Sequence, residues 1–162
     1  MSRNRVTEKD HGWGRIKGEI QAAQGSGVKV GVLSDSGART NFPADNARGD
    51  SSDADMLLVA AANEFGTDTI PARPFMRGGF DQNQRALGRT AQRLWNQVLA
   101  GTLTARQALG LLGEQHQGQV QQYIVALSTP QNADSTIARK GSSNPLNDEG
   151  RLRNSIRWEH DE

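Results

Sequence analysis

Two prolines near the middle of the chain set the strongest limit on its fold. They stand in the segment Ile70–Arg77, IPARPFMR, and each proline lacks a backbone donor and biases the residue before it toward extended geometry. This segment therefore cannot form the interior of a helix, and we predict a stiff connector over residues 70–77. Apolar residues at helical spacing occur on both sides of the connector, so the chain must place helices before and after a rigid elbow.

The residues before the elbow predict a helix that is apolar nearly all round. Its cap is Asp53 or Asp55, its middle reads MLLVAAA, and Gly66 after Phe65 is expected to stop it. Because this pattern leaves hardly any polar face, we expect the helix to be buried.

Two longer helices are predicted after the elbow. Asp81, which follows two glycines, can cap the first, and Gly101 can end it. Thr104 can cap the second, which runs to about Leu127. Their apolar stripes are Leu87, Ala91, Leu94, Trp95 and Val98 in the first helix, and Ala105, Ala108, Leu109, Leu112, Val120, Tyr123, Ile124 and Leu127 in the second.

Alternating residues predict two strands. Residues 28–33 read VKVGVL and residues 156–160 read IRWEH, both with a period of two. We expect the terminal strand to pair with the first one. Trp13, Ile16 and Ile20 are spaced by three and four residues, which indicates a short amphipathic helix near residues 12–23.

These elements predict one α+β domain in which a small antiparallel sheet packs against one or two long helices. A length of 162 residues suits a single core. Residues 1–24 form an N-terminal arm that carries the short helix. Residues 34–53 and 131–150 are rich in Gly, Ser, Asp and Asn, and we predict two long loops that order when the protein assembles.

Composition narrows the class of partner. A formal net charge of +1 produces no global field toward nucleic acid or an anionic membrane, so we expect a protein partner. The chain has no cysteine, which removes disulfides and suits a reducing cytosol. Its first residues lack the apolar core of a signal peptide, and no apolar run approaches the roughly 18 residues that span a bilayer. We expect a soluble protein without a membrane partner.

The sequence offers no set of residues that would act together as an active site. Its three histidines lie at positions 11, 116 and 160 without a second ligand at metal spacing. The aspartates at 45, 50, 53 and 55 lack the glycine and terminal glutamate of a calcium loop. We therefore expect no enzyme activity, no metal and no cofactor, and interpret His116 as a surface or interfacial side chain.

Three segments, in this order, resemble a known group of proteins. They are VKVGVL at residues 28–33, AAANEFG running into IPARPFM over residues 60–76, and NPLNDEGRLRNSI at residues 144–156. Together they resemble the tail-completion and head-to-tail joining proteins of tailed bacteriophages, in the neighbourhood of the lambda-type minor tail protein Z. The second segment carries most of the resemblance and the third comes next.

The resemblance implies a structural protein of the virion, made in the host cytoplasm, that assembles as a ring. A hexamer is one candidate, with tail tube, tail terminator or head–tail connector proteins as neighbours. Both a position at the neck and one at the tail end are open. The matched residues would then have fold roles: Phe65, Gly66, Ile70, Pro71, Arg73, Pro74, Phe75, Gly150, Leu152, Ser155 and Ile156. In particular, Gly150 would turn the chain into the terminal strand.

Loop and basic residues are the candidate assembly contacts. They are Phe42, Arg48, Arg139, Lys140, Arg151 and Arg153. The C-terminal basic residues of this set, with Arg157, leave a second hypothesis open, in which an accessory protein touches DNA phosphates at the portal. Acidic residues interleave with these arginines, so salt bridges between subunits explain them equally well.

Overall fold

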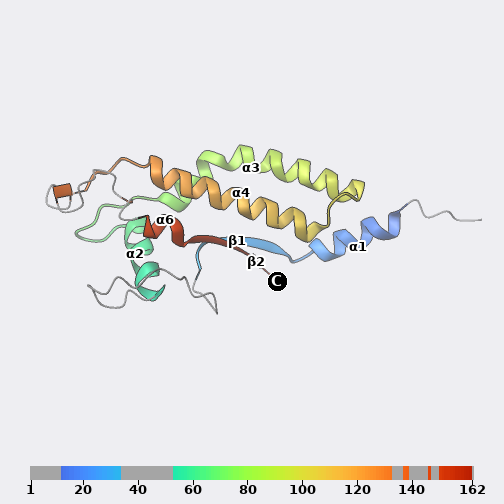
Figure 1. The fold of residues 1–162 in the computed structure, drawn as a ribbon, viewed down its shortest axis with the longest axis horizontal. Coiled ribbons are helices and arrows are strands. Elements are labelled where there is room, and N and C mark those ends of the chain that lie inside the picture. The colour runs from blue at the N-terminus through green and yellow to red at the C-terminus, as the bar shows by residue number, and fades with distance from the viewer. Residues whose placement is uncertain (1–11, 34–52, 133–136, 139–145, 147–149, 162) are drawn as a thin grey trace, which may run out of the picture.

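Two long helices, α3 (Phe75–Ala100) and α4 (Ala105–Ala126), form a hairpin, and the other elements pack around it (Figure 1). The structure is a computed structural model that describes residues 12–33, 53–132, 137–138, 146 and 150–161. Helix α4 packs against α3 on one side and against a two-stranded sheet on the other. The order of layers is therefore sheet, α4 and α3, which leaves the outer side of α3 uncovered by these elements.

The sheet pairs the two segments that alternation predicts. Strand β1 (Gly27–Val32) runs antiparallel to β2 (Ile156–Asp161), with Val30 opposite Trp158. Both strands lie within one or two residues of their predicted bounds, and the predicted α+β class is confirmed. The two strands are far apart in the sequence, so their pairing joins a segment near the start of the described chain to its last element.

Two glycines of α4 make room for the sheet. A Cβ atom at Gly110 would lie 3.1 Å from the Trp158 ring, and one at Gly113 would lie 2.9 Å from it. A side chain at Gly113 would force the ring to move and one at Gly110 would be in tight contact with it, so the indole of Trp158 packs directly on the backbone of α4. The contact brings the sheet close to the helix.

Three shorter helices stand at the two ends of the hairpin (Figure 1). Helix α1 (Trp13–Ala23) lies at the corner where α3 turns into α4, and α2 (Asp53–Phe65) and α6 (Arg151–Ser155) lie at the other end. The predicted caps of the hairpin turn are confirmed. Gly101 has a φ of 83° after α3, and Thr104 forms a reciprocal capping box with Gln107 at the start of α4.

Two apolar clusters fill the interior. The larger lies between the sheet, α4 and the end that carries α2, and consists of Ala60, Phe75, Val120, Ile124, Leu146, Leu152 and Ile156. The smaller lies at the corner between α3 and α4 and consists of Leu94, Val98, Ala105 and Ala108. Leu152 and Ile156, two residues of the third resembling segment, are therefore part of the core.

The start of α3 corrects the sequence interpretation. The helix begins at Phe75, six residues before Asp81, so Asp81 is not its cap and the connector ends at Pro74. Gly78 and Gly79 lie inside the helix. A Cβ atom at Gly78 would collide with the ring of Tyr123, and one at Gly79 would lie 3.3 Å from a methyl group of Val120. These glycines therefore allow α3 to approach α4 closely and do not interrupt the helix.

Burial of α2 also differs from expectation. Helix α2 is not buried all round, because Leu57, Leu58 and Phe65 remain exposed. Helix α1 has no buried residue, and 67% of Trp13 is exposed. Both helices form as predicted, but each finds a partner surface on one side only.

The C-terminal region differs in one detail. Gly150 has a φ of 71° but precedes helix α6, and the strand begins only at Ile156. Ser155 closes this short helix by donating its hydroxyl to the carbonyl of Leu152 at 2.7 Å. Residues 34–52 and most of 131–150, the two predicted loops, lie outside the described residues, as does the first part of the predicted arm.

Candidate functional site

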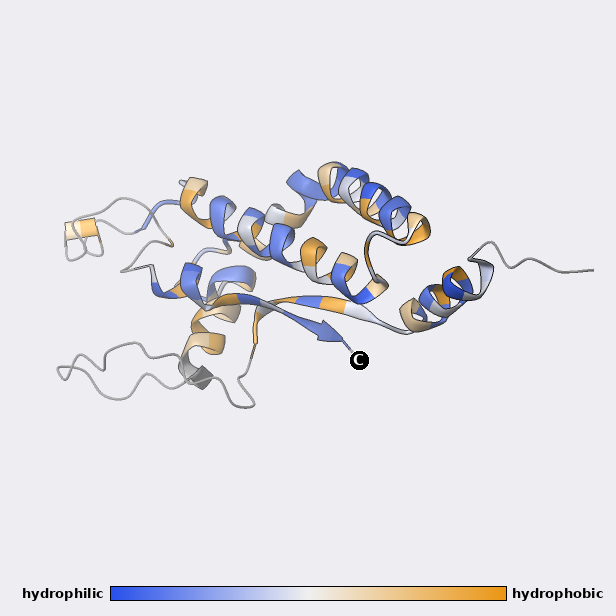
Figure 2. Ribbon diagram, turned by 45° about the vertical axis from the view of Figure 1, so that its right-hand side comes forward, coloured by the Kyte–Doolittle hydropathy of each residue, from blue (hydrophilic) through white to orange (hydrophobic). Residues whose placement is uncertain are grey.

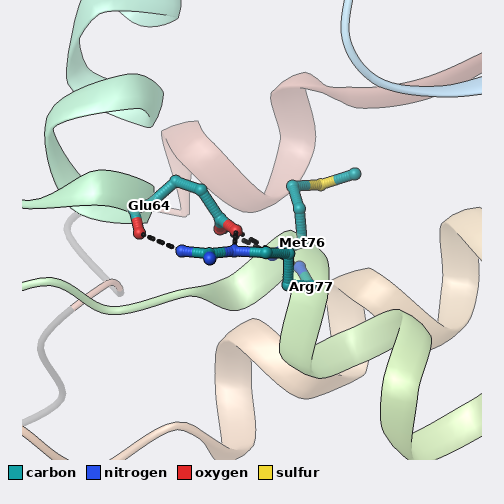
Figure 3. A network of polar contacts seen from close by, with 3 residues as sticks. All are labelled: Glu64, Met76 and Arg77. Atoms are coloured by element: carbon teal, nitrogen blue, oxygen red, sulfur yellow. Dashed lines mark hydrogen bonds and ion pairs between the residues drawn. The ribbon is translucent and has the colours of Figure 1, made fainter.

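The junction between α2 and α3 contains a buried carboxylate that caps the second helix. Glu64 has 6% of its surface exposed, and its two carboxylate oxygens accept the backbone N–H groups of Met76 at 2.9 Å and Arg77 at 3.3 Å (Figure 3). The first N–H groups of a helix lack partners inside the helix. Pro74, the N-cap residue, provides no side-chain cap, so a residue of the preceding helix performs that function.

Arg77 completes this contact from the side of α3. Its Nε atom lies 3.0 Å from a carboxylate oxygen of Glu64, and its Nη2 atom donates to the backbone carbonyl of Glu64 at 3.3 Å. Its guanidinium carbon also lies 5.6 Å from the centre of the Phe65 ring. The Glu64 carboxylate is thus held by the N-terminus of α3 and by one guanidinium.

Arg73 is the second charged residue buried at this junction, with 4% of its surface exposed. Its Nε and Nη2 atoms donate to the carbonyls of Pro130 at 2.8 Å and Gln131 at 3.0 Å, and the side-chain oxygens of Asn63 and Asn132 accept two more bonds. Burial lowers the pKa of the Arg73 guanidinium from its ordinary value. One side chain thereby joins the end of α2 to the chain that leaves α4.

Backbone contacts complete the turn between these two charged residues. Gly66 adopts a φ of 80°, and a Cβ atom there would lie 2.9 Å from the nitrogen of Ala72. The N–H of Arg73 donates to the carbonyl of Asn63 at 2.6 Å. Gly66 therefore ends α2 as predicted, and Phe75, 1% exposed, anchors the start of α3 in the core.

The sequence interpretation placed the rigidity of this segment in its prolines and missed the roles of Glu64 and Arg73. A signal for both residues was present. Glu64 is the only charged residue between Met56 and Gly66, and Arg73 stands between an alanine and a proline. A lone charge within an apolar segment is usually paired when it becomes buried.

The outer side of α2 is an exposed apolar face. Leu57, Leu58 and Phe65 are 48%, 69% and 71% exposed, and Ala61 and Ala62 lie between them on the helix. The opposite side carries Met56, Ala60 and Glu64 toward the core. Figure 2 shows α2 as a largely apolar helix at the edge of the molecule. We call the set Leu57, Leu58, Ala61, Ala62 and Phe65 the α2 face.

The predicted fold-motif residues gather at this end, although Phe65 proves to be exposed and not part of the core. Of the predicted assembly contacts, Arg151 is exposed on α6, which packs against α2. Arg153 is half-buried, with its Nε atom 3.3 Å from Asn154. Phe42, Arg48, Arg139 and Lys140 lie outside the described residues.

Other groups of possible chemical interest are few in the described part of the chain. Within it, no three His, Asp or Glu side chains come close enough to hold a metal ion. His116 is half-buried beside Phe80, with ring centres 5.6 Å apart, and burial lowers the pKa of its imidazole. A shallow open depression on α3 is lined by Arg89, Gln92, Arg93, Asn96, Gln97 and Thr102.

Comparisons of the chain with protein-family models, with curated proteins and with solved structures found no match. None of the helices in the described ranges is both long and apolar enough to cross a bilayer. The functional argument therefore starts from the α2 face, from the junction beside it and from the charge on α3.

Proposed function

We propose that this protein is a structural component of a tailed-phage virion. Several copies form a ring at the junction of the phage head and the tail and join the two. The observation that carries the proposal is the α2 face. Large apolar side chains that remain exposed together on a folded domain mark a surface that another protein covers. Leu58 and Phe65, seven residues apart on one side of α2, are both about 70% exposed.

The junction beside the α2 face supports an assembly role. Helix α2 is held against α3 through Glu64 and against the chain after α4 through Arg73. An interface built on a rigid element loses less conformational entropy on association than one built on a mobile segment. The same segment carries the strongest resemblance to head-to-tail joining proteins, so the resemblance and the exposed face coincide.

The surroundings of the α2 face fit the usual layout of a protein interface, in which polar groups border an apolar centre. Arg151 of the neighbouring helix α6 is exposed, and Arg77 is 63% exposed beside Phe65. In a ring, one copy's α2 face would contact a different surface of the next copy, because a closed ring uses head-to-tail contacts.

The first experiment measures the mass of the purified protein. We expect a ring-sized oligomer in analytical ultracentrifugation and closed rings in negative-stain electron microscopy. Leu58→Glu places a charge at the centre of the α2 face without touching the core, and it should shift the protein toward the monomer. Leu111→Glu on α4, where Leu111 is 45% exposed, is the matched control and should leave the ring intact.

A wild-type protein that stays monomeric at all concentrations, alone and with tail proteins, would contradict the proposal. So would equal losses of assembly in the two variants, because the α2 face would then have no special part. Immunogold labelling of phage particles tests the location. Gold at the neck supports head-to-tail joining, gold at the distal end supports the alternative of a tail-end protein, and no gold on the particle overturns both.

A further inference from the structure

Helix α3 carries a row of three arginines on its outer side. Arg85, Arg89 and Arg93 follow one another at intervals of four residues, which places them on one face of a helix. All three are exposed, while Leu87, Leu94 and Val98 of the same helix are buried. We call these three arginines the α3 stripe. It points away from the layer formed by α4 and the sheet.

The α3 stripe has no partner within the protein as described. These three side chains form no hydrogen bond or ion pair with another described residue, whereas those of Arg15, Arg73 and Arg77 do. The sequence from residue 82 to residue 113 contains no Asp or Glu, and the only acidic residue of α3 is Asp81. Asp81 stands four residues before Arg85 on the same face, so one carboxylate accompanies three arginines and a net positive charge remains on this side of α3.

Neutral polar side chains flank the α3 stripe. Gln92, Asn96 and Gln97, with Arg89 and Arg93, line the shallow depression on the outside of α3. Such amides donate hydrogen bonds to phosphate and sugar oxygens in nucleic-acid complexes. Guanidinium groups bind phosphate through two parallel hydrogen bonds, a geometry that a lysine does not provide.

We propose that the α3 stripe binds the phosphate backbone of nucleic acid. At a rise of about 1.5 Å per residue the three arginines lie about 6 Å apart and span roughly 12 Å, a length of duplex axis over which one strand presents about three to four phosphates. The long arginine side chains of the α3 stripe can therefore reach about three phosphates of one strand. Such a contact depends on the charge of the phosphates and does not distinguish between base sequences.

An acidic protein is the competing partner, and the composition of the surface disfavours it. Protein interfaces have an apolar centre with a polar border, whereas the depression at the stripe is lined by arginines, amides, a threonine and one alanine. The most exposed neighbouring apolar side chains lie on α2, where Leu58 and Phe65 are 69% and 71% exposed, whereas Trp95 and Leu99 of α3 are each 37% exposed. The two surfaces thus differ in chemistry, one suited to a protein and the other to a polyanion.

The test measures binding of the full-length protein to a fluorescein-labelled DNA duplex by fluorescence anisotropy. If three phosphates are neutralised, the affinity should fall about 40-fold between 50 and 200 mM salt, from a log–log slope of about −0.9 per phosphate. Arg85→Gln, Arg89→Gln and Arg93→Gln combined should remove this binding. A parallel titration with labelled oligo(dT) shows whether a duplex or a single strand is preferred.

The matched control removes three positive charges elsewhere, through Arg139→Gln, Lys140→Gln and Arg151→Gln. It should keep most of the DNA affinity, and an equal loss in the control would overturn the assignment to α3. Should the triple α3 variant fail to fold, as judged by circular dichroism, Arg89→Gln alone is used. That single variant should make the slope less steep by about 0.9.

Two further outcomes would overturn the proposal. One is the absence of DNA binding at about 100 µM protein, the weak limit of ordinary non-specific affinities. The other is preferential binding of labelled poly-glutamate through the same arginines, which would identify an acidic protein as the partner. The two proposals can fail independently. The α3 variants should still form rings, and the Leu58→Glu variant should still bind DNA through its α3 stripe.

Discussion

At both ends of the α3–α4 hairpin, charged side chains from a neighbouring helix cap the helix ends, but the capping side chains differ in how deeply they are buried. At the end near α2, which we call the elbow end, Glu64 caps the start of α3 from a buried position. At the corner end, α1 provides both caps. Arg15 donates to the carbonyls of Val98 and Leu99 at 2.9 and 2.7 Å, and Glu19 accepts the N–H of Ala105 at 2.7 Å.

The two ends share a charge pattern. At each end a carboxylate faces the N-terminus of one helix, α3 at the elbow end and α4 at the corner end. A guanidinium also faces the C-terminus of the preceding helix, which is α2 at the elbow end and α3 at the corner end. The helix dipole favours both arrangements. The two ends differ in access to water. The side chain of Glu64 is 8% exposed, whereas Arg15 is exposed and Glu19 half-exposed. The capping side chains at the corner end are in contact with water, whereas Glu64 is enclosed by the protein and is paired with Arg77, so equal substitutions should have unequal effects.

The largest effect is expected at the elbow end. Glu64→Ala removes a buried carboxylate, leaves the first N–H groups of α3 and the Arg77 guanidinium without this acceptor, and should lower the free energy of unfolding by about 3 kcal/mol. Urea denaturation followed by circular dichroism measures the change, with Asp68→Ala at an exposed site as the control. A loss no greater than that of the control would break the comparison between the two ends.

A substitution in the middle of α4 tests the close contact with the sheet. Gly113→Ala introduces a Cβ atom 2.9 Å from the Trp158 ring and should cost about 2 kcal/mol, because overpacking outweighs the gain in helix propensity. Gly118→Ala on the same helix meets nothing within 4 Å. It should stabilise the protein by roughly 0.5–1 kcal/mol. Thermal denaturation of both variants checks the opposite signs.

The corner end should show a smaller effect. Arg15→Ala removes two hydrogen bonds to the last carbonyls of α3 and should cost about 1 kcal/mol, since hydrogen bonds from an exposed side chain replace bonds that the same side chain would form with water. Lys17→Ala, on the same helix, is the control. A variant that combines Arg15→Ala with Glu64→Ala should lose the sum of the two single losses in free energy of unfolding, because the two sites are far apart. A loss at Arg15 as large as that at Glu64 would remove the distinction between the ends.

The smallest effect concerns pH. Burial lowers the pKa of His116 below its ordinary value of 6.5, so the folded protein binds a proton there less readily than the unfolded chain does. This contribution to stability is complete above about pH 6.5 and is lost as the pH falls through the lower folded pKa. Denaturation curves between about pH 7.5 and pH 5 should therefore show a decline that His116→Gln reduces. An unchanged decline would contradict it.

Most elements were predictable from the sequence because their signals are local. The period of two in residues 28–33 and 156–160 indicates strands whatever surrounds them. Gly66, Gly101 and the Thr104 capping box mark helix ends through their own conformations and neighbours. The pairing of the two strands was also predictable, since no other strand candidate was present in the sequence.

The start of α3 was not predictable from local rules. Asp81 is a favourable cap by residue type, yet the helix begins at Phe75 because Glu64, twelve residues before Met76, caps it across the turn. The burial of Arg73 likewise depends on carbonyls nearly sixty residues away in the chain. A cap or a buried charge that relies on a distant partner leaves only a weak trace in the sequence, namely an isolated charge among apolar residues.

The sequence by itself determined most helical and extended segments, with the exception of α6 and the first turn of α3, because backbone preferences and apolar periodicity act over a few residues. Only the tertiary structure decided which apolar faces become covered. Helix α2 is apolar nearly all round, but only the side with Met56 and Ala60 meets the core, whereas Leu58 stays exposed. Burial requires a second surface, and the other described elements supply one on a single side of α2.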